Sequence, residues 1–245
     1  DQYNITNDYK KKNYIKNKLN DLKDGSIQRI FERDELLINN YETSLSMSDM
    51  KDGFYYTNNQ IFLQKFISNF TDNNGILLYH GVGVGKTCAS ILISQNFVNT
   101  FPQKILVLAP HSLQSNYKKE LFNASKLDFE NHNYVSCFGK KYLTDLDDWH
   151  TMNTNSISKK INAIINTEYE FFGYQKVVNL MQKLKDKSKT KFGYDVKKMN
   201  NDYYQKIHEL FSNRVIIIDE VHNIRSSSDK DVKMFPKKME EILKY

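Results

Sequence analysis

The stretch from residue 76 to residue 87 constrains the fold of this chain most, because three kinds of sequence follow one another in it. An apolar run comes first, a glycine-rich loop follows, and the loop ends in Lys86-Thr87, where a helical pattern begins. Glycine backbones can turn successive N–H groups around an anion, and the N-terminal N–H groups of a helix point at the same anion. The stretch therefore predicts a buried strand over 76–79 and then a phosphate-binding loop that opens a helix.

The loop carries the side chains that a nucleoside triphosphate needs. Lys86 can reach the β- and γ-phosphates and the Thr87 hydroxyl can hold magnesium, so ATP and Mg²⁺ are the expected cofactors. The strict pattern begins with glycine, and His80 stands at that position here. A glycine-rich turn without function is the alternative, which the strand before the loop and the helix after it disfavour. The nucleotide-binding residues that we expect in the loop are Gly81, Val82, Gly83, Val84, Gly85, Lys86, Thr87 and Cys88.

A second apolar run, from Val215 to Ile218, ends in the acidic pair Asp219-Glu220. Ligands of open parallel sheets bind outside the carboxyl ends of the strands, so we expect this pair and the glycine loop at the same edge. Asp219 is expected to hold magnesium, largely through water, and Glu220 to activate the attacking water. His222 follows closely, and a lone histidine is more often a hydrogen-bonded structural residue than a catalytic one.

Apolar runs alternate with helical patterns along the chain, which predicts an α/β fold with a mostly parallel central sheet flanked by helices. We expect a polar helical extension over residues 1–55 and an ATP-binding lobe over 56–245. The stretch 140–158 is expected to form a loop, and the pattern over 161–172 fits a strand or a helix. Strands are expected over 76–79, 104–109, 134–138 and 214–218. Helices are expected over 57–70, 86–98, 111–122, 174–212 and 228–245, and a lysine-rich insert over 183–198 that contains Gly193 is expected to break the helix over 174–212.

Composition narrows the function less than the motifs do. The net charge of +6 fits a nucleic-acid partner and fits a lysine-rich surface equally well. The lysine-rich stretch 183–198 could contact nucleic acid, although a solvated insert is the favoured interpretation. Cys88 and Cys137 lie far apart and match no metal-site spacing, so neither a disulfide nor a zinc site is expected. No apolar run approaches the roughly 18 residues that cross a bilayer, and we expect an intracellular, cytoplasmic protein without a membrane partner.

Three segments resemble motifs of superfamily 2 (DEAD/DEAH-like) helicases and translocases. Gly83-Val-Gly-Lys-Thr87 is similar to their first motif, and Asp219-Glu-Val-His222 is similar to their Asp-Glu-x-His box. The segment from Leu108 to Leu121 resembles their motif Ia, with Tyr117 where many relatives have tryptophan. The resemblance covers residues 57–226. It extends in particular to helicase-like ATPases of large DNA viruses, such as the small subunit of the poxvirus early transcription factor and the poxvirus nucleoside triphosphatases.

This resemblance implies the first RecA-like lobe of a nucleic-acid-dependent ATPase, with transcription as one setting and the virion as a location if the protein is viral. Gln60 would contact adenine, and His222 would couple the γ-phosphate to a second lobe or to nucleic acid. DNA is expected ahead of RNA, although the residues themselves do not choose between them. The further implied partners are a second RecA-like lobe and RNA polymerase or other transcription factors. The residues implied near the nucleic-acid backbone are Pro110, Ser112 and Asn116.

The resemblance also leads us to expect a Ser-Ala-Thr motif and a second lobe with arginine fingers, and neither occurs before Tyr245. Arginine fingers contribute about 10³- to 10⁵-fold to the rate of related reactions. We therefore expect this chain to bind ATP and to hydrolyse it poorly on its own. Two other classes stay open: a P-loop ATPase of another motor type, such as a packaging or AAA-type machine, and a helicase-like lobe that acts as a non-catalytic scaffold.

Overall fold

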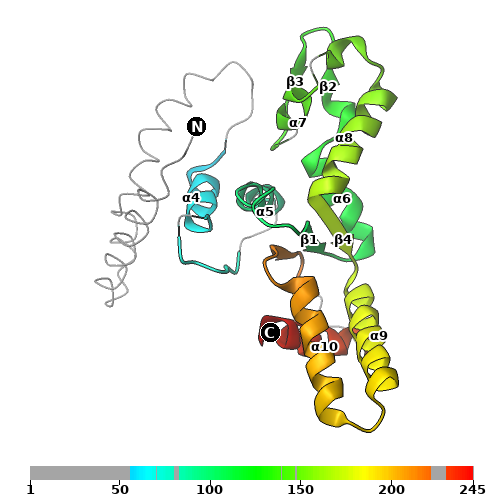
Figure 1. Cartoon of the computed structure of the whole chain (residues 1–245). Coiled ribbons are helices and arrows are strands. Elements are labelled where there is room, and N and C mark those ends of the chain that lie inside the picture. The colour runs from blue at the N-terminus through cyan, green and yellow to red at the C-terminus, as the bar shows by residue number, and fades with distance from the viewer. Residues whose placement is uncertain are drawn as a thin grey trace, which may run out of the picture. The chain divides into compact units, whose positions relative to one another are not determined.

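The computed structural model describes residues 56–69, 71–79, 83–138, 140–146, 148–221 and 230–244 (Figure 1). The expected extension over residues 1–55 lies outside these ranges. The described chain forms two compact units. Of the described residues, the first unit holds those up to Phe97 together with those in Glu120–Asn162, and the second holds Val98–Lys119 together with those from Ala163 onward.

Two helices that flank the glycine loop form the core of the first unit. Helix α4 spans Asn58–Phe66 and helix α5 spans Lys86–Gln95, close to the expected ranges. They pack through buried side chains spaced three or four residues apart, as amphipathic helices do. These core residues are Leu63, Ile67, Ala89 and Ile93.

The expected strand over 76–79 is absent, and this prediction is wrong for the structure described. The segment has no strand assignment, and Leu77 and Tyr79 are 75% and 96% exposed. A strand needs a neighbour for its N–H and C=O groups. Within the described part of the first unit, the strands β2 (Leu127–Asp128) and β3 (Asn133–Tyr134) pair only with each other. The segment 76–79 therefore has no partner strand among the described residues of its own unit.

The rest of the first unit is more helical than the sequence suggested. The strand expected over 134–138 is reduced to a two-residue antiparallel contact at Tyr134. The stretch 140–158, which was expected to form a loop, contains short helices instead. Tyr142 and Leu143 of α7 are buried, and their burial stabilises this helix. The elements of this part are the 3₁₀ turns η1 (Ala124–Lys126) and η2 (Trp149–Thr151), the helix α7 (Lys140–Thr144) and the first part of α8 (Thr154–Glu168), whose residues from Ala163 onward belong to the second unit.

The second unit is built on a parallel sheet, as predicted. Strand β1 (Ile105–Leu108) lies in the middle, between β4 (Tyr169–Phe172) and β5 (Ile216–Ile218). Leu108 is opposite both Phe172 and Ile218, so all three strands end level at their carboxyl edge. The undecided stretch 161–172 is therefore the end of a helix followed by a strand.

Helices cover both faces of this sheet. The helices α9 (Tyr174–Phe192), α10 (Val196–Phe211) and α12 (Lys230–Lys244) bury one face, which presents Leu106 and Leu108. On the other face, Tyr117 of α6 (His111–Leu121) contacts Phe171, with ring centroids 5.9 Å apart. This arrangement is the α/β layering expected of a RecA-like lobe. The helices searched within the described ranges include none that is long and apolar enough to cross a membrane.

Candidate active site

The described part of the glycine loop has a backbone that only glycine adopts easily. Gly83 and Gly85 have φ angles of +78° and +80°, in the left-handed region. Gly85 is the N-cap of α5, and no side chain caps that helix. A Cβ on Gly85 would lie 2.6 Å from the Nε2 atom of Gln60, so the end of the Gln60 side chain would have to shift. The N-terminus of α5 therefore presents backbone N–H groups, and these groups carry the partial positive charge that can bind an anion.

Gln60 ties this loop to the preceding helix. Its Nε2 donates to the Gly85 carbonyl at 3.3 Å, and its Oε1 accepts from the Thr57 backbone N–H at 2.9 Å. The Gln60 backbone N–H in turn donates to the Thr57 hydroxyl at 3.3 Å, which completes a capping box. Gln60 thus positions the loop, and its contact with adenine stays a prediction. The Thr-x-x-Gln spacing before an apolar helix is the sequence signal for Thr57, which our sequence analysis did not use.

Lys86, Thr87 and Cys88 form the first turn of α5. Cys88 is buried and forms a disulfide with Cys137, with Cα atoms 5.8 Å apart. The sequence-based expectation of no disulfide is therefore wrong. The separation of 49 residues hid the pair, because only the folded first unit brings the start of α5 next to the segment before α7. The bond fixes the first turn of the helix that carries Lys86 and Thr87.

The acidic pair lies at the carboxyl edge of the sheet in the second unit. The Asp219 N–H donates to the Leu108 carbonyl at 2.9 Å, which continues the ladder between β5 and β1. Glu220 has a φ of +54°, in the left-handed region that costs a non-glycine residue about 1–2 kcal/mol. Such a strained backbone persists where the surrounding structure holds it, and it is frequent at functional sites.

Tyr174, the first residue of α9, holds this strained turn. Its hydroxyl donates to the Asp219 carbonyl, and to the Glu220 carbonyl over 3.3 Å. Burial, together with the charges of the two acidic side chains, raises the pKa of Tyr174 to about 12. The phenol therefore stays protonated, and able to donate, at every pH below that value. Sequence analysis missed Tyr174, and the only available signal was its position after a Gly173 that ends an apolar run.

The residues expected to contact nucleic acid begin at the same edge. Pro110 follows the end of β1, and Ser112 and Asn116 are exposed on α6, one helical turn apart. The remaining expected residues, Gly81, Val82 and His222, lie outside the described ranges. No group of three or more His, Cys, Asp or Glu residues that could hold a metal occurs in the described part of the chain. Mg²⁺ does not require such a group, because it keeps several waters and uses one or two protein ligands plus phosphate.

The chain has a parallel sheet flanked by helices, a glycine loop at a helix N-terminus without a side-chain cap, and an acidic pair after a strand. These features define the class of RecA-like ATPases. The family described as "Type III restriction enzyme, res subunit" matches residues 35–245. The chain belongs to this family, and it is a superfamily 2 helicase-like ATPase domain, as its motifs predicted. No solved structure matches the chain.

Similar proteins occur in large DNA viruses. The chain is 31% identical over 171 residues to a "Putative ATP-dependent RNA helicase" of Acanthamoeba polyphaga mimivirus, covering 69% of this chain and 24% of that protein. A second mimivirus protein with the same description is 27% identical, with 91% and 19% covered. A "Putative helicase" of Invertebrate iridescent virus 3 is 28% identical, with 69% and 15% covered. The chain thus spans less than a quarter of the length of each of these relatives.

Replacing Tyr174 by phenylalanine is expected to loosen the acidic turn, because two carbonyls lose their hydroxyl donor. We expect the free energy of unfolding to fall by about 1–2 kcal/mol and ATP turnover to fall several-fold. Denaturant unfolding and a steady-state ATPase assay measure the two effects. Tyr194→Phe is the matched control, because Tyr194 is fully exposed and phenylalanine keeps its ring, and both measurements are made without nucleic acid. Equal values for the two variants would contradict the anchoring role of Tyr174.

Proposed function

We propose that this chain is the first lobe of an ATP-driven helicase or translocase that acts on a nucleic-acid strand. The observation that supports this most is the local geometry of the glycine loop. Its glycines have left-handed backbones, and the N-terminus of α5 has no side-chain cap. Family membership supports the same conclusion. The proposal requires the loop and the acidic pair to bind one nucleotide together.

In this proposal the ATP phosphates lie against the N-terminal N–H groups of α5, and Lys86 neutralises the β- and γ-phosphates. Thr87 and Asp219 would hold Mg²⁺, which when bound offsets negative charge on the phosphates. Glu220 orients the attacking water and accepts its proton, and Tyr174 keeps the backbone of Glu220 in place. His222 is proposed to couple the state of the γ-phosphate to a second lobe or to nucleic acid, and Gln60 to reach adenine.

Nucleic acid is proposed to cross the carboxyl edge near Pro110, Ser112 and Asn116. Exposed hydroxyl and amide groups at the start of a helix are suited to phosphate oxygens. Two of the similar proteins are described as RNA helicases, so the strand could be RNA as well as DNA. We propose a second RecA-like lobe as the source of the remaining catalytic groups, and a viral transcription complex containing RNA polymerase as one setting.

The proposal is tested by replacing Glu220 with glutamine in the full-length protein. We expect ATP binding to persist and turnover stimulated by nucleic acid to fall by about 10²- to 10⁴-fold, because the proton acceptor is lost. Glu130→Gln is the control, since Glu130 is an exposed residue of the first unit. Unchanged ATP turnover in Glu220→Gln would contradict the proposed role of Glu220. Absence of turnover from the wild type with both DNA and RNA would favour a non-catalytic scaffold instead.

A further inference from the structure

One hairpin of the second unit carries a strong net positive charge. Helices α9 and α10 lie side by side and are joined at Gly193, which has a φ of +58° (Figure 1). Residues 183–198, here named the lysine arm, contain seven lysines and two aspartates, a net charge of +5. The whole 245-residue chain has a net charge of +6. The net charge of this sixteen-residue segment is thus nearly as large as that of the whole chain.

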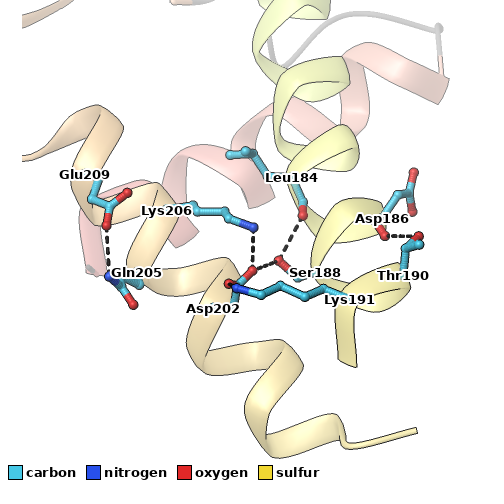
Figure 2. Close-up of polar contacts among 9 residues, drawn as sticks. All are labelled: Leu184, Asp186, Ser188, Thr190, Lys191, Asp202, Gln205, Lys206 and Glu209. Atoms are coloured by element: carbon cyan, nitrogen blue, oxygen red, sulfur yellow. Dashed lines mark hydrogen bonds and ion pairs between the residues drawn. The ribbon is translucent and has the colours of Figure 1, made fainter. Parts of the chain in front are cut away.

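The lysine arm extends beyond the hydrophobic core. The core residues of α9 end at Met181, with Leu184 packed at the margin, and those of α10 begin at Tyr203. The arm between these points is held instead by polar contacts around Asp202, shown in Figure 2. Asp202 accepts hydrogen bonds from Ser188 at 2.6 Å and from Lys191 at 3.0 Å, and it also pairs with Lys206. The hydrogen bonds from Lys206, Ser188 and Lys191 hold the pKa of Asp202 well below its usual range.

The polar contacts of Asp202 leave most of the positive charge of the lysine arm unneutralised. The exposed Lys183, Lys185, Lys187 and Lys189 form no ion pair within the described part of the chain. Lys183, Lys187 and Lys191 recur every four residues, which places them along one side of the helix about 6 Å apart. With Asp186 and Thr190 they line a shallow hollow of about 460 Å³. The surface is a row of lysines beside a shallow hollow.

The chemistry of the arm favours a phosphate chain over other acidic partners. A membrane helix needs an exposed apolar face, whereas the apolar faces of α9 and α10 are buried in the core. Protein interfaces are depleted in lysine and rely on tryptophan, tyrosine and arginine anchors. Lysines without arginines make point-charge contacts with phosphates, which position a strand without reading its sequence.

The tip of the arm adds an aromatic group. Tyr194 is fully exposed, and Val196 beside it is 60% exposed. The neighbouring Phe192 ring has the Lys191 ammonium 4.8 Å from its centroid. Proteins that bind single strands combine a basic surface with aromatic rings on which unpaired bases stack. The Tyr194 ring is positioned for such stacking.

We propose that the lysine arm binds the phosphate backbone of a nucleic-acid strand without sequence preference, with Tyr194 stacking on an unpaired base. This surface lies outside the motif residues near Pro110, and its binding requires no ATP. It therefore extends the proposed function and does not depend on the nucleotide site.

The test is to replace Lys183, Lys185, Lys187 and Lys189 together by glutamine in the full-length protein. Affinity for an unstructured single-stranded oligonucleotide is measured without ATP over a range of salt concentrations. Each lost phosphate contact lowers the slope of log K against log salt by about 0.7, so we expect a slope lower by about 2–3 and an affinity at least about tenfold weaker. The control replaces four other exposed lysines by glutamine: Lys126, Lys159, Lys160 and Lys237.

Equal slopes for the arm variant and the control variant would overturn the proposal. Loss of binding to phosphatidylserine vesicles, with oligonucleotide binding unchanged, would assign the arm to membranes and would also overturn it. Tyr194→Ser is expected to weaken single-strand binding about tenfold and to leave duplex binding unchanged. Unchanged single-strand binding would contradict the stacking contact. Because no step uses ATP, failure of the nucleotide site would leave these results unaffected.

Discussion

The Lys86→Ala variant of the full-length protein is expected to hydrolyse ATP at least about 100-fold more slowly than the wild type. Lys86 is in the first turn of α5, and it is the proposed cation for the β- and γ-phosphates. Removing one preorganised charge-stabilising group from an active site costs about 10²- to 10³-fold in rate. A steady-state ATPase assay with saturating nucleic acid measures this loss, and equilibrium nucleotide binding measures the accompanying loss of affinity.

The control for this variant is Lys159→Ala, because Lys159 is an exposed lysine of α8. It carries the same change of charge and should retain full activity. Wild-type turnover by Lys86→Ala would show that the glycine loop is not the site of ATP hydrolysis. Biological activity that survives the substitution would favour the scaffold alternative.

The Cys137→Ala variant is expected to be less stable than the wild type by about 2–4 kcal/mol in the absence of reductant. The disulfide with Cys88 links residues 49 positions apart, and closing a loop of this length constrains the unfolded chain. Denaturant unfolding of the 245-residue chain measures the difference, and it is monitored by a signal from the first unit. The substitution spares Cys88, so it leaves the first turn of α5 otherwise intact.

A reductant provides the matched comparison for this prediction. Wild-type protein treated with dithiothreitol should lose the same stability, and the Cys137→Ala variant should not respond. If the wild type is equally stable with and without reductant, the disulfide either does not form or contributes nothing to stability. Mass spectrometry of the unreduced protein distinguishes these two cases.

The sequence predicted the second unit well, because local patterns set its elements. Apolar runs identified β1 and β5 as parallel strands, although β5 is only partly buried. The lysine-rich break expected over 183–198 is much shorter in the structure, where only residues 193–195 separate α9 from α10. The segments that form α4, α5, α6 and α12 were also correctly predicted to be helices. The chain's membership in the family agrees with the motifs that suggested it.

The failures share a physical cause, which is that non-local pairing decided the outcome. The segment 76–79 has the composition of a strand but no neighbouring strand in the part of its unit that the structure describes. The Cys88–Cys137 bond and the contact of Tyr174 with the turn at 219–220 join residues 45 to 49 positions apart. Spacing rules within one segment contain no information about such contacts. The stretch 161–172 was undecided because a helix end and a strand share one apolar run.

The central claim is that the turn at 85–87 and the acidic pair at 219–220 hold one metal–nucleotide complex. Replacing Mg²⁺ by Fe²⁺ in the full-length protein, with ATP, ascorbate and peroxide, cuts the backbone next to the bound metal. We expect two sets of cuts, one beside residues 85–88 and one beside 217–221, both requiring ATP and both suppressed by excess Mg²⁺. Cuts at only one of these stretches, or cuts that do not depend on ATP, would contradict the claim.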